Sequence, residues 1–184
     1  YARGIGVLID VVHNHYGPSD LPMWCFDSEC YGAGGAYFYT DNRLESGWGP
    51  RPDFGRVEVR DFIVDSARMW LEEYRADGLR WDSTVNIRTA AGRDNADGWH
   101  TMQRANEWVR KYQPRKLMIA EDLQGNEWLV KDVGAGGAGF ASQWDAGFFH
   151  PVDDALIAQN DTGRNMGAIK GAIDGAVANI ESAI

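Results

Sequence analysis

The 184-residue sequence is poor in cysteine, histidine and basic residues. Two cysteines and four histidines, without the spacing of a ligand set, argue against a zinc site. Lysine and arginine number 18 against 27 acidic residues, and the net charge of -9 argues against a nucleic-acid partner. The sequence also has no apolar run of membrane-spanning length and no Gly-x-Ser-x-Gly motif, so it gives no support to a membrane protein or a serine hydrolase.

The two cysteines, Cys25 and Cys30, lie close together in one segment. A disulfide, two free thiols and half of a metal site all fit this spacing. The chain starts with Tyr1 rather than an initiator methionine, so we expect it to begin inside a longer protein. We favour reduced thiols and a cytoplasmic location.

Aromatic residues are abundant, with eight Trp, seven Tyr and seven Phe. Rings at this density suggest stacking platforms for a ring-shaped ligand, although most aromatic side chains serve the core. Trp48, Tyr37 and Tyr39 fit either a sugar platform or simple loop packing.

Strand-like and helix-like segments alternate along the chain. Apolar runs predict buried strands at residues 4–12, 79–81, 116–120 and 140–144, the first of them buried on both faces. Apolar residues at three-to-four spacing predict helices at residues 56–75 and 99–112, a short helix near 127–131 and a helical tail from 153. Gly78 fits the glycine that follows a helix.

Two segments lack this periodicity. Residues 87–98 are predicted to be a polar loop, and residues 16–55 are rich in Gly, Pro, Ser, Asp and aromatics. The longer segment exceeds an ordinary connection, so we expect a functional loop or a small subdomain after the first strand. The alternation elsewhere predicts βα units, a parallel sheet and an α/β fold class.

Each predicted strand carries an acid at or near its carboxyl end. These acids are Asp10, Asp82, Glu121 and Asp145. In a (β/α) barrel this is the end at which the active site is built from several strands. We therefore expect a cluster of carboxylates at one edge of the sheet.

Two of these acids suit glycoside chemistry. Arg80 lies two residues before Asp82 and so on the same face of a strand, where a cation favours the ionised form that a nucleophile needs. Glu121 follows an apolar strand with no cation next to it in sequence, which suits a general acid. A retaining glycosidase places such a pair about 5 Å apart. An ordinary helix cap is the alternative role for Asp82.

The histidines near the first strand allow a further interpretation. His13 and His15 alternate along an extended segment and could ligate a metal together with Asp10. We favour a structural or sugar-binding role for them instead.

Three short stretches resemble the α-amylase family of glycoside hydrolases. Residues 10–15 (DVVHNH) resemble its first signature region, residues 78–82 (GLRWD) its second and residues 119–122 (IAED) its third. They occur in the order and at spacings similar to those of the family. The resemblance extends from about residue 4 to at least residue 151.

The resemblance implies a role for each matching residue. Asp82 matches the nucleophile and Glu121 the general acid/base. Arg80 matches the arginine that supports the nucleophile, Asp10 an acid that holds this arginine, and His15 a histidine that binds the sugar.

Two further residues carry weaker implications. Asn14 matches a position that binds a structural calcium ion in some members, and we expect no required cofactor. Trp144, next to Asp145, is expected to line the substrate pocket.

Within the family, the chain is most similar to 1,4-α-glucan branching enzymes. The supporting stretches are residues 15–19 (HYGPS), 51–60 (RPDFGRVEVR), 70–74 (WLEEY) and 143–145 (QWD). The implied substrate is an α-1,4-glucan or a maltooligosaccharide. The alternatives are an α-amylase, a trehalose-releasing maltooligosaccharide hydrolase, and a non-catalytic glucan-binding relative.

The sequence departs from the family in one respect. The family's third catalytic carboxylate lies in a His-Asp pair, and no His-Asp pair occurs in this chain. A whole (β/α)8 TIM barrel needs about 250 residues, so we expect residues 1–184 to be a fragment of one catalytic barrel domain that covers strands three to six. We expect little or no turnover from this polypeptide alone.

Overall fold

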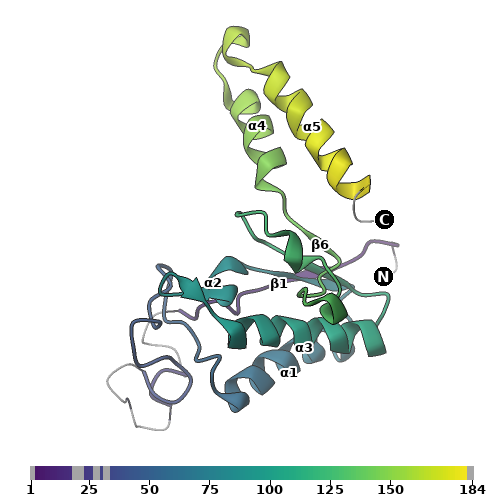
Figure 1. Cartoon of the computed structure of the whole chain (residues 1–184). Helices are drawn as coiled ribbons and strands as arrows, with labels where there is room; N and C mark the ends of the chain where they lie inside the picture. Colours follow the sequence, from purple (N-terminus) through teal and green to yellow (C-terminus); the bar gives the residue numbers. More distant parts are fainter. Residues whose placement is uncertain (1–2, 18–22, 27–29, 31–33, 182–184) are drawn as a thin grey trace.

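The computed structural model describes residues 3–17, 23–26, 30 and 34–181, with residues 177–181 described by their backbone only. One parallel sheet with helices on one face forms the body of the molecule (Figure 1). The α/β fold class predicted from the sequence is confirmed.

Four short parallel strands make up the main sheet. They are β1 (Leu8–Val11), β2 (Gly78–Trp81), β5 (Leu117–Ala120) and β6 (Ser142–Gln143). Their order in the sheet is β1-β2-β5-β6, so strands neighbouring in the sheet follow one another along the chain. This is the arrangement of one arc of a (β/α)8 barrel. The prediction of about four parallel strands is confirmed.

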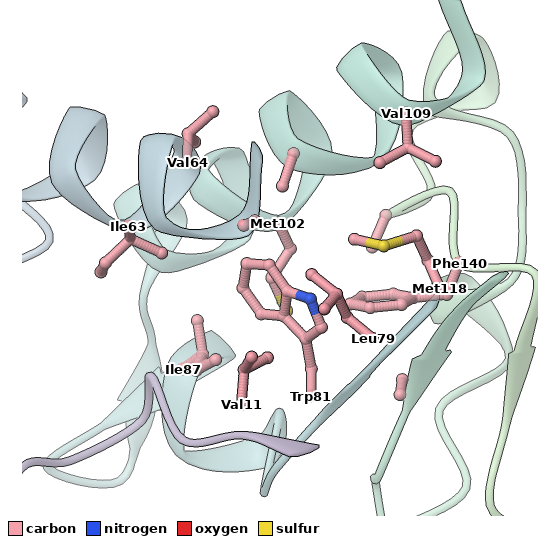
Figure 2. Close-up of a cluster of buried hydrophobic side chains, with 14 of the residues drawn as sticks. Val11, Ile63, Val64, Leu79, Trp81, Ile87, Met102, Val109, Met118 and Phe140 are labelled. Carbon is pink, nitrogen blue, oxygen red and sulfur yellow. The ribbon is translucent and has the colours of Figure 1, made fainter. Parts of the chain in front are cut away.

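Two amphipathic helices cover one face of the sheet. They are α1 (Val57–Glu72) and α3 (Ala96–Tyr112). Val59, Ile63 and Leu71 recur at helical spacing on α1 and are buried, which is why this segment forms a helix against the sheet. The core between these layers includes Val11, Ile63, Leu79, Trp81, Met102, Val109, Met118 and Phe140 (Figure 2).

The opposite face of the sheet is open to solvent. Leu8 is 45% exposed and Leu117 is 50% exposed. The prediction that the first strand is buried on both faces is therefore wrong for this structure, because only one face of the sheet is covered by helices. The face that stays open is the one that carries Arg80.

The predicted polar loop at residues 87–98 contains regular structure. A short helix α2 (Val85–Arg88) leads into a hairpin of β3 (Thr89–Ala90) and β4 (Arg93–Asp94). Ala91 and Gly92 form the turn, with φ of 50° and 73°. Positive φ at both central residues is typical of the type I′ turn, whose twist matches that of the strands in a two-residue hairpin.

The last third of the chain is mainly helical. Two short 3-10 helices, η1 (Glu127–Leu129) and η2 (Val133–Ala135), precede β6. The predicted tail is two α-helices, α4 (Ala146–Ile157) and α5 (Met166–Glu181), joined through η3 (Asp161–Gly163). These two helices pack on each other and extend away from the sheet (Figure 1).

The long segment after β1 is irregular where the structure describes it; residues 18–22, 27–29 and 31–33 lie outside the described residues. Isolated β-bridges join Phe38 to Pro52 and Glu45 to Pro50. Arg51 is buried and its Nε donates to the backbone oxygen of Asn86, at 3.0 Å. This bond ties the segment to α2.

Cys25 and Cys30 form a disulfide. The expectation of reduced thiols is therefore wrong for this structure. The backbone N–H of Cys25 donates to the Gly34 oxygen, and the N–H of Gly34 donates to the Cys30 oxygen. These bonds fold the chain back and bring the two Cα atoms to 4.8 Å, within the range that a disulfide can span. The spacing of the two cysteines in the sequence does not by itself predict this backbone arrangement.

Gly78 lies in β2 rather than at the end of the preceding helix. Helix α1 already ends at Glu72, and Arg75, with a φ of 58°, is the left-handed residue after it. A Cβ on Gly78 would lie 2.3 Å from the Leu117 backbone oxygen and 2.8 Å from Leu8 Cδ2. The glycine is required because the backbone of β5 and the Leu8 side chain of β1 approach it closely.

We expect Gly78→Ala to lower the free energy of unfolding by about 2 kcal/mol, because the added methyl group must push the backbone of β5 away from β2 and displace the Leu8 side chain. Urea unfolding of the protein measures this loss. Gly171→Ala is the matched control, since a Cβ at Gly171 meets nothing within 4 Å. A loss at Gly78 no larger than at Gly171 would contradict the close approach.

Candidate active site

The strand ends place acids from neighbouring strands side by side. Asp10 pairs with Arg80 in the β1-β2 ladder. The pairing continues one residue beyond the strands through three bonds: Asp82 N–H to the Val11 oxygen, Glu121 N–H to the Trp81 oxygen and Trp144 N–H to the Ala120 oxygen. Asp82, Glu121 and Trp144 therefore occupy one level, with Asp10 two residues below it.

One guanidinium contacts three of the four predicted acids. Arg80 Nη1 lies 2.7 Å from Asp10 Oδ1 and 2.7 Å from Asp82 Oδ1. Its Nη2 lies 2.8 Å from Glu121 Oε2. The structure thus brings Asp10, Asp82 and Glu121 together around Arg80, as their positions at strand ends predicted.

The environment of Arg80 strengthens its positive charge. Burial alone would lower the pKa of Arg80, but the hydrogen bonds that Arg80 donates to Asp10 and Asp82, together with the charge of Glu121, raise it above its ordinary value. The ring of Trp144 lies 4.4 Å from Arg80 Cζ, a cation–π contact. Arg80 therefore stays charged and fixed between the carboxylates and the ring.

The second oxygen of Asp82 is held by Asn14. The Asn14 amide donates to Asp82 Oδ2 and to the Asp82 backbone oxygen, at 2.8 Å each. Asn14 is fully buried. The sequence did not indicate this contact, although the position of Asn14 just after a strand-end acid could have suggested it.

His15 completes this side of the site. Its Nδ1 lies within hydrogen-bonding distance of Asn14 Oδ1. Because the Asn14 amide nitrogen faces Asp82, its oxygen faces His15, so His15 Nδ1 carries the proton. Partial burial lowers the pKa of His15, and the charge of Asp82 offsets part of this effect. A neutral imidazole at neutral pH follows.

Glu121 is held from two directions. The Ser83 N–H donates to Glu121 Oε2 at 2.8 Å, and Arg80 contacts the same oxygen. No cation lies next to Glu121 in sequence, yet the fold brings the Arg80 guanidinium against it. Arg80 is distant in sequence but adjacent in the sheet, because β2 and β5 are neighbours.

Asp145 does not join the cluster. It is the N-cap of α4, and its Oδ1 accepts a hydrogen bond of 2.8 Å from the Gly147 N–H. The expectation that all four strand-end acids meet is wrong for Asp145, which lies one residue beyond the level of Asp82 and Glu121. The helix-cap alternative considered for Asp82 applies to Asp145.

The residues proposed for a metal site point apart. His13 is buried against Trp81, with ring centroids 4.9 Å apart, whereas Asp10 contacts Arg80 and His15 contacts Asn14. Among the described residues, no group of three or more His, Cys, Asp or Glu side chains could hold a metal ion. The amide nitrogen of Asn14 donates to Asp82, and its oxygen lies against His15 Nδ1, so both polar atoms of this side chain have partners within the protein.

The loop aromatics divide into two kinds. Tyr39 is 1% exposed and belongs to the core, so it cannot serve as a sugar platform. Tyr37 packs against Phe26 and Phe62. Trp48 is 76% exposed and remains a candidate platform.

A parallel βα sheet with two acids and a shared arginine at its strand ends defines a class. It is the class of (β/α)-barrel enzymes that act on glycosidic bonds with paired carboxylates.

Comparisons with known proteins place the chain within this class. It is 32% identical over 167 residues to the 1,4-alpha-glucan branching enzyme GlgB of Corynebacterium glutamicum, a match that covers 82% of this chain and 22% of the relative. The branching enzyme of Myxococcus xanthus is also 32% identical, over 168 residues, with the same coverage. No family model matches the chain.

Solved structures agree with this assignment. The fold matches a Salmonella typhimurium protein assigned as an α-amylase, with a TM-score of 0.63, 22% identity, and coverage of 86% of this chain and 26% of that one. A pullulanase from Bacillus acidopullulyticus matches with a TM-score of 0.50 and 25% identity over 65% of this chain and 14% of that one. The chain belongs to the α-amylase family of glycoside hydrolases. It spans 22% of the length of the curated relatives it matches.

No helix among the described residues is long and apolar enough to cross a membrane.

Proposed function

We propose that this chain carries the nucleophile and the general acid/base of a retaining α-glucan-active enzyme. Asp82 is the nucleophile and Glu121 the acid/base. We propose further that the protein is a 1,4-α-glucan branching enzyme, which cleaves α-1,4 bonds and transfers the released segment to form α-1,6 branches. The curated relatives named above support this choice of reaction.

The observation that carries the proposal is the double contact of Arg80. A single guanidinium touches both Asp82 and Glu121, at 2.7 and 2.8 Å. Because both carboxylates contact the same small guanidinium group, they are close together. This favours the separation of about 5 Å between the two carboxylates of a retaining enzyme over the wider gap that an inverting enzyme needs for water.

The reaction then has two steps. An Asp82 oxygen attacks the anomeric carbon, the bond from that carbon to the glycosidic oxygen breaks, and Glu121 gives its proton to the departing oxygen. In the second step the 6-hydroxyl of an acceptor glucose attacks the same carbon, Glu121 takes its proton, and the glycosyl-Asp82 bond breaks. Two inversions at the carbon retain the α configuration.

The remaining site residues bind and orient. Asp10 holds Arg80 from the side opposite Glu121, which keeps the arginine beside the nucleophile. His15 offers an unprotonated Nε2 to a sugar hydroxyl at the cleavage subsite. Trp144 is half exposed and presents an aromatic surface to the sugar next to Arg80.

We also propose that residues 1–184 are part of one catalytic (β/α)8 domain, with residues 16–55 as a loop subdomain after β1. The longer protein, here called the full-length enzyme, would supply the remaining strands and the third carboxylate. An α-1,4-glucan is its substrate, and the reaction needs no cofactor.

Incubation of the full-length enzyme with amylose tests the reaction class. We expect new α-1,6 linkages, seen by proton NMR and by the short chains that a debranching enzyme releases, with little change in the number of reducing ends. The reason is that a sugar hydroxyl, rather than water, takes the glycosyl group from Asp82.

Two other outcomes would contradict branching. Reducing ends that rise without new branches would identify an α-amylase, or a trehalose-releasing maltooligosaccharide hydrolase if trehalose appears. Binding of amylose with neither product would identify a non-catalytic glucan-binding protein.

A further inference from the structure

A second ion pair lies next to the carboxylate cluster and outside it. Arg88 Nε lies 2.7 Å from Asp122 Oδ2, and Arg88 Nη2 lies 3.1 Å from Asp122 Oδ1. The Asp122 side chain is fully buried, and that of Arg88 is 13% exposed. Two parallel hydrogen bonds in a nearly solvent-free environment fix the geometry of this ion pair, whereas the exposed ion pairs of this chain are less constrained.

The ion pair belongs to a set of contacts that connect residues 83–88 with Glu121 and Asp122. Asp122 directly follows Glu121, and Arg88 is the last residue of α2, which begins just after Thr84. The Thr84 N–H and Oγ1 both donate to the Glu121 backbone oxygen, at 2.8 Å each. The Ser83 N–H donates to Glu121 Oε2. Residues 83–88, which hold the Glu121 carboxylate through the Ser83 N–H, are thus also bound to Asp122 through Arg88.

The burial of Asp122 makes its ion pair with Arg88 important. An ionised carboxylate away from water must be paired and hydrogen-bonded. Besides Arg88, Asp122 Oδ1 accepts the Gln124 N–H at 3.0 Å, and Thr84 Oγ1 lies 3.4 Å from Oδ2. Arg88 is the cation of this network, so loss of its fork frees α2 to move relative to the end of β5.

We propose that Arg88 and Asp122 are positioning residues for Glu121. Their ion pair holds the Ser83 amide against Glu121 Oε2 and so fixes the proton-transferring carboxylate relative to Asp82. This inference rests on the proposed function, in which Glu121 protonates the leaving oxygen. The resemblance to the α-amylase family assigns no role to either residue.

Arg88→Lys in the full-length enzyme tests the proposal. Lysine keeps the positive charge beside Asp122 but cannot form the two-pronged contact, so the variant still pairs the buried charge. We expect kcat on amylose to fall about 30-fold with KM unchanged, because a carboxylate displaced by a fraction of an ångström loses proton transfer rather than binding. Far-UV circular dichroism and the melting temperature establish that the variant is folded.

A second substrate separates positioning from general damage. An α-maltosyl fluoride donor releases fluoride, which needs little help from a general acid. We expect pre-steady-state fluoride release by Arg88→Lys to stay within about threefold of wild type. Arg104→Lys is the matched control, since Arg104 on α3 forms an exposed ion pair with Asp61 on α1, at 2.5 Å.

The outcomes separate this inference from the proposed function. Equal losses on amylose and on the fluoride, or no loss on amylose, would overturn the positioning role. Glu121→Gln, measured in parallel, tests the function itself: full activity of that variant on amylose would overturn both. If Glu121→Gln loses activity while Arg88→Lys is as active as the wild type, the positioning role alone is overturned.

Discussion

We expect Asp82→Asn in the full-length enzyme to lower kcat on amylose by on the order of 10⁴-fold. An amide oxygen is a poor nucleophile, and the neutral side chain no longer balances the charge of Arg80, which lies 2.7 Å away. The shape of the side chain is kept, so substrate binding changes little. Steady-state rates on amylose measure the loss.

Asp145→Asn is the control for this substitution. Asp145 also ends a predicted strand, but it caps α4 through the Gly147 N–H. Asparagine is an equally good N-cap, so we expect kcat within about threefold of wild type. Comparable losses in the two variants would show that Asp82 is not the nucleophile.

An external nucleophile identifies the role of Asp82 more directly. Asp82→Ala leaves space where the carboxylate stood, and azide ion can attack the anomeric carbon of an α-maltosyl fluoride from that side. We expect a β-glycosyl azide, whose configuration is opposite to that of the donor, because only one inversion has taken place. An α-glycosyl azide would place the nucleophile elsewhere.

The second large expected effect is a loss of folding stability at acidic pH that is caused by His13. His13 is buried, and neither of its ring nitrogens has a hydrogen-bond partner among the described residues. Burial lowers its pKa from 6.5 to about 4. The unfolded chain therefore binds a proton at a higher pH than the folded one. The contribution to stability is complete above pH 6.5 and is lost as the pH falls toward 4. The loss is about 3 kcal/mol over this window.

His13→Phe should remove this dependence. The phenyl ring fills a similar space against Trp81 and has no site to protonate. We expect the free energy of unfolding of the variant, relative to wild type, to rise by about 3 kcal/mol between pH 6.5 and 4. Urea unfolding at several pH values measures the difference. His100→Asn is the control, because His100 is exposed; a constant difference between His13→Phe and wild type would refute the buried neutral state.

The sequence predicted the parts of the fold that repeat simple patterns. The apolar stripe through Val59, Ile63 and Leu71 predicted α1, and the run before Glu121 predicted β5. The hairpin at β3 and β4 was missed because its turn, Ala91-Gly92, joins strands of two residues each, too short for an alternating pattern. Tertiary contacts, rather than local propensity, also decide that Gly78 lies within a strand.

The candidate site was predictable in its members and not in its contacts. Asp10, Asp82 and Glu121 were expected together because parallel strands end at the same edge of a sheet. Which atoms of Arg80 meet which acid depends on the register of β1, β2 and β5, and no local pattern encodes that register. The capping role of Asp145 and the burial of Asn14 likewise depend on how the chain continues after each strand.

The three carboxylates around Arg80 have a consequence for how substitutions combine. Asp10, Asp82 and Glu121 share one guanidinium, so their contributions are thermodynamically coupled. Once Arg80 has been replaced, removal of Asp10 costs less than it does in the wild type, because the charge that Asp10 balances is already gone. Single-variant losses at this cluster therefore overlap, and their sum exceeds the loss in the combined variant.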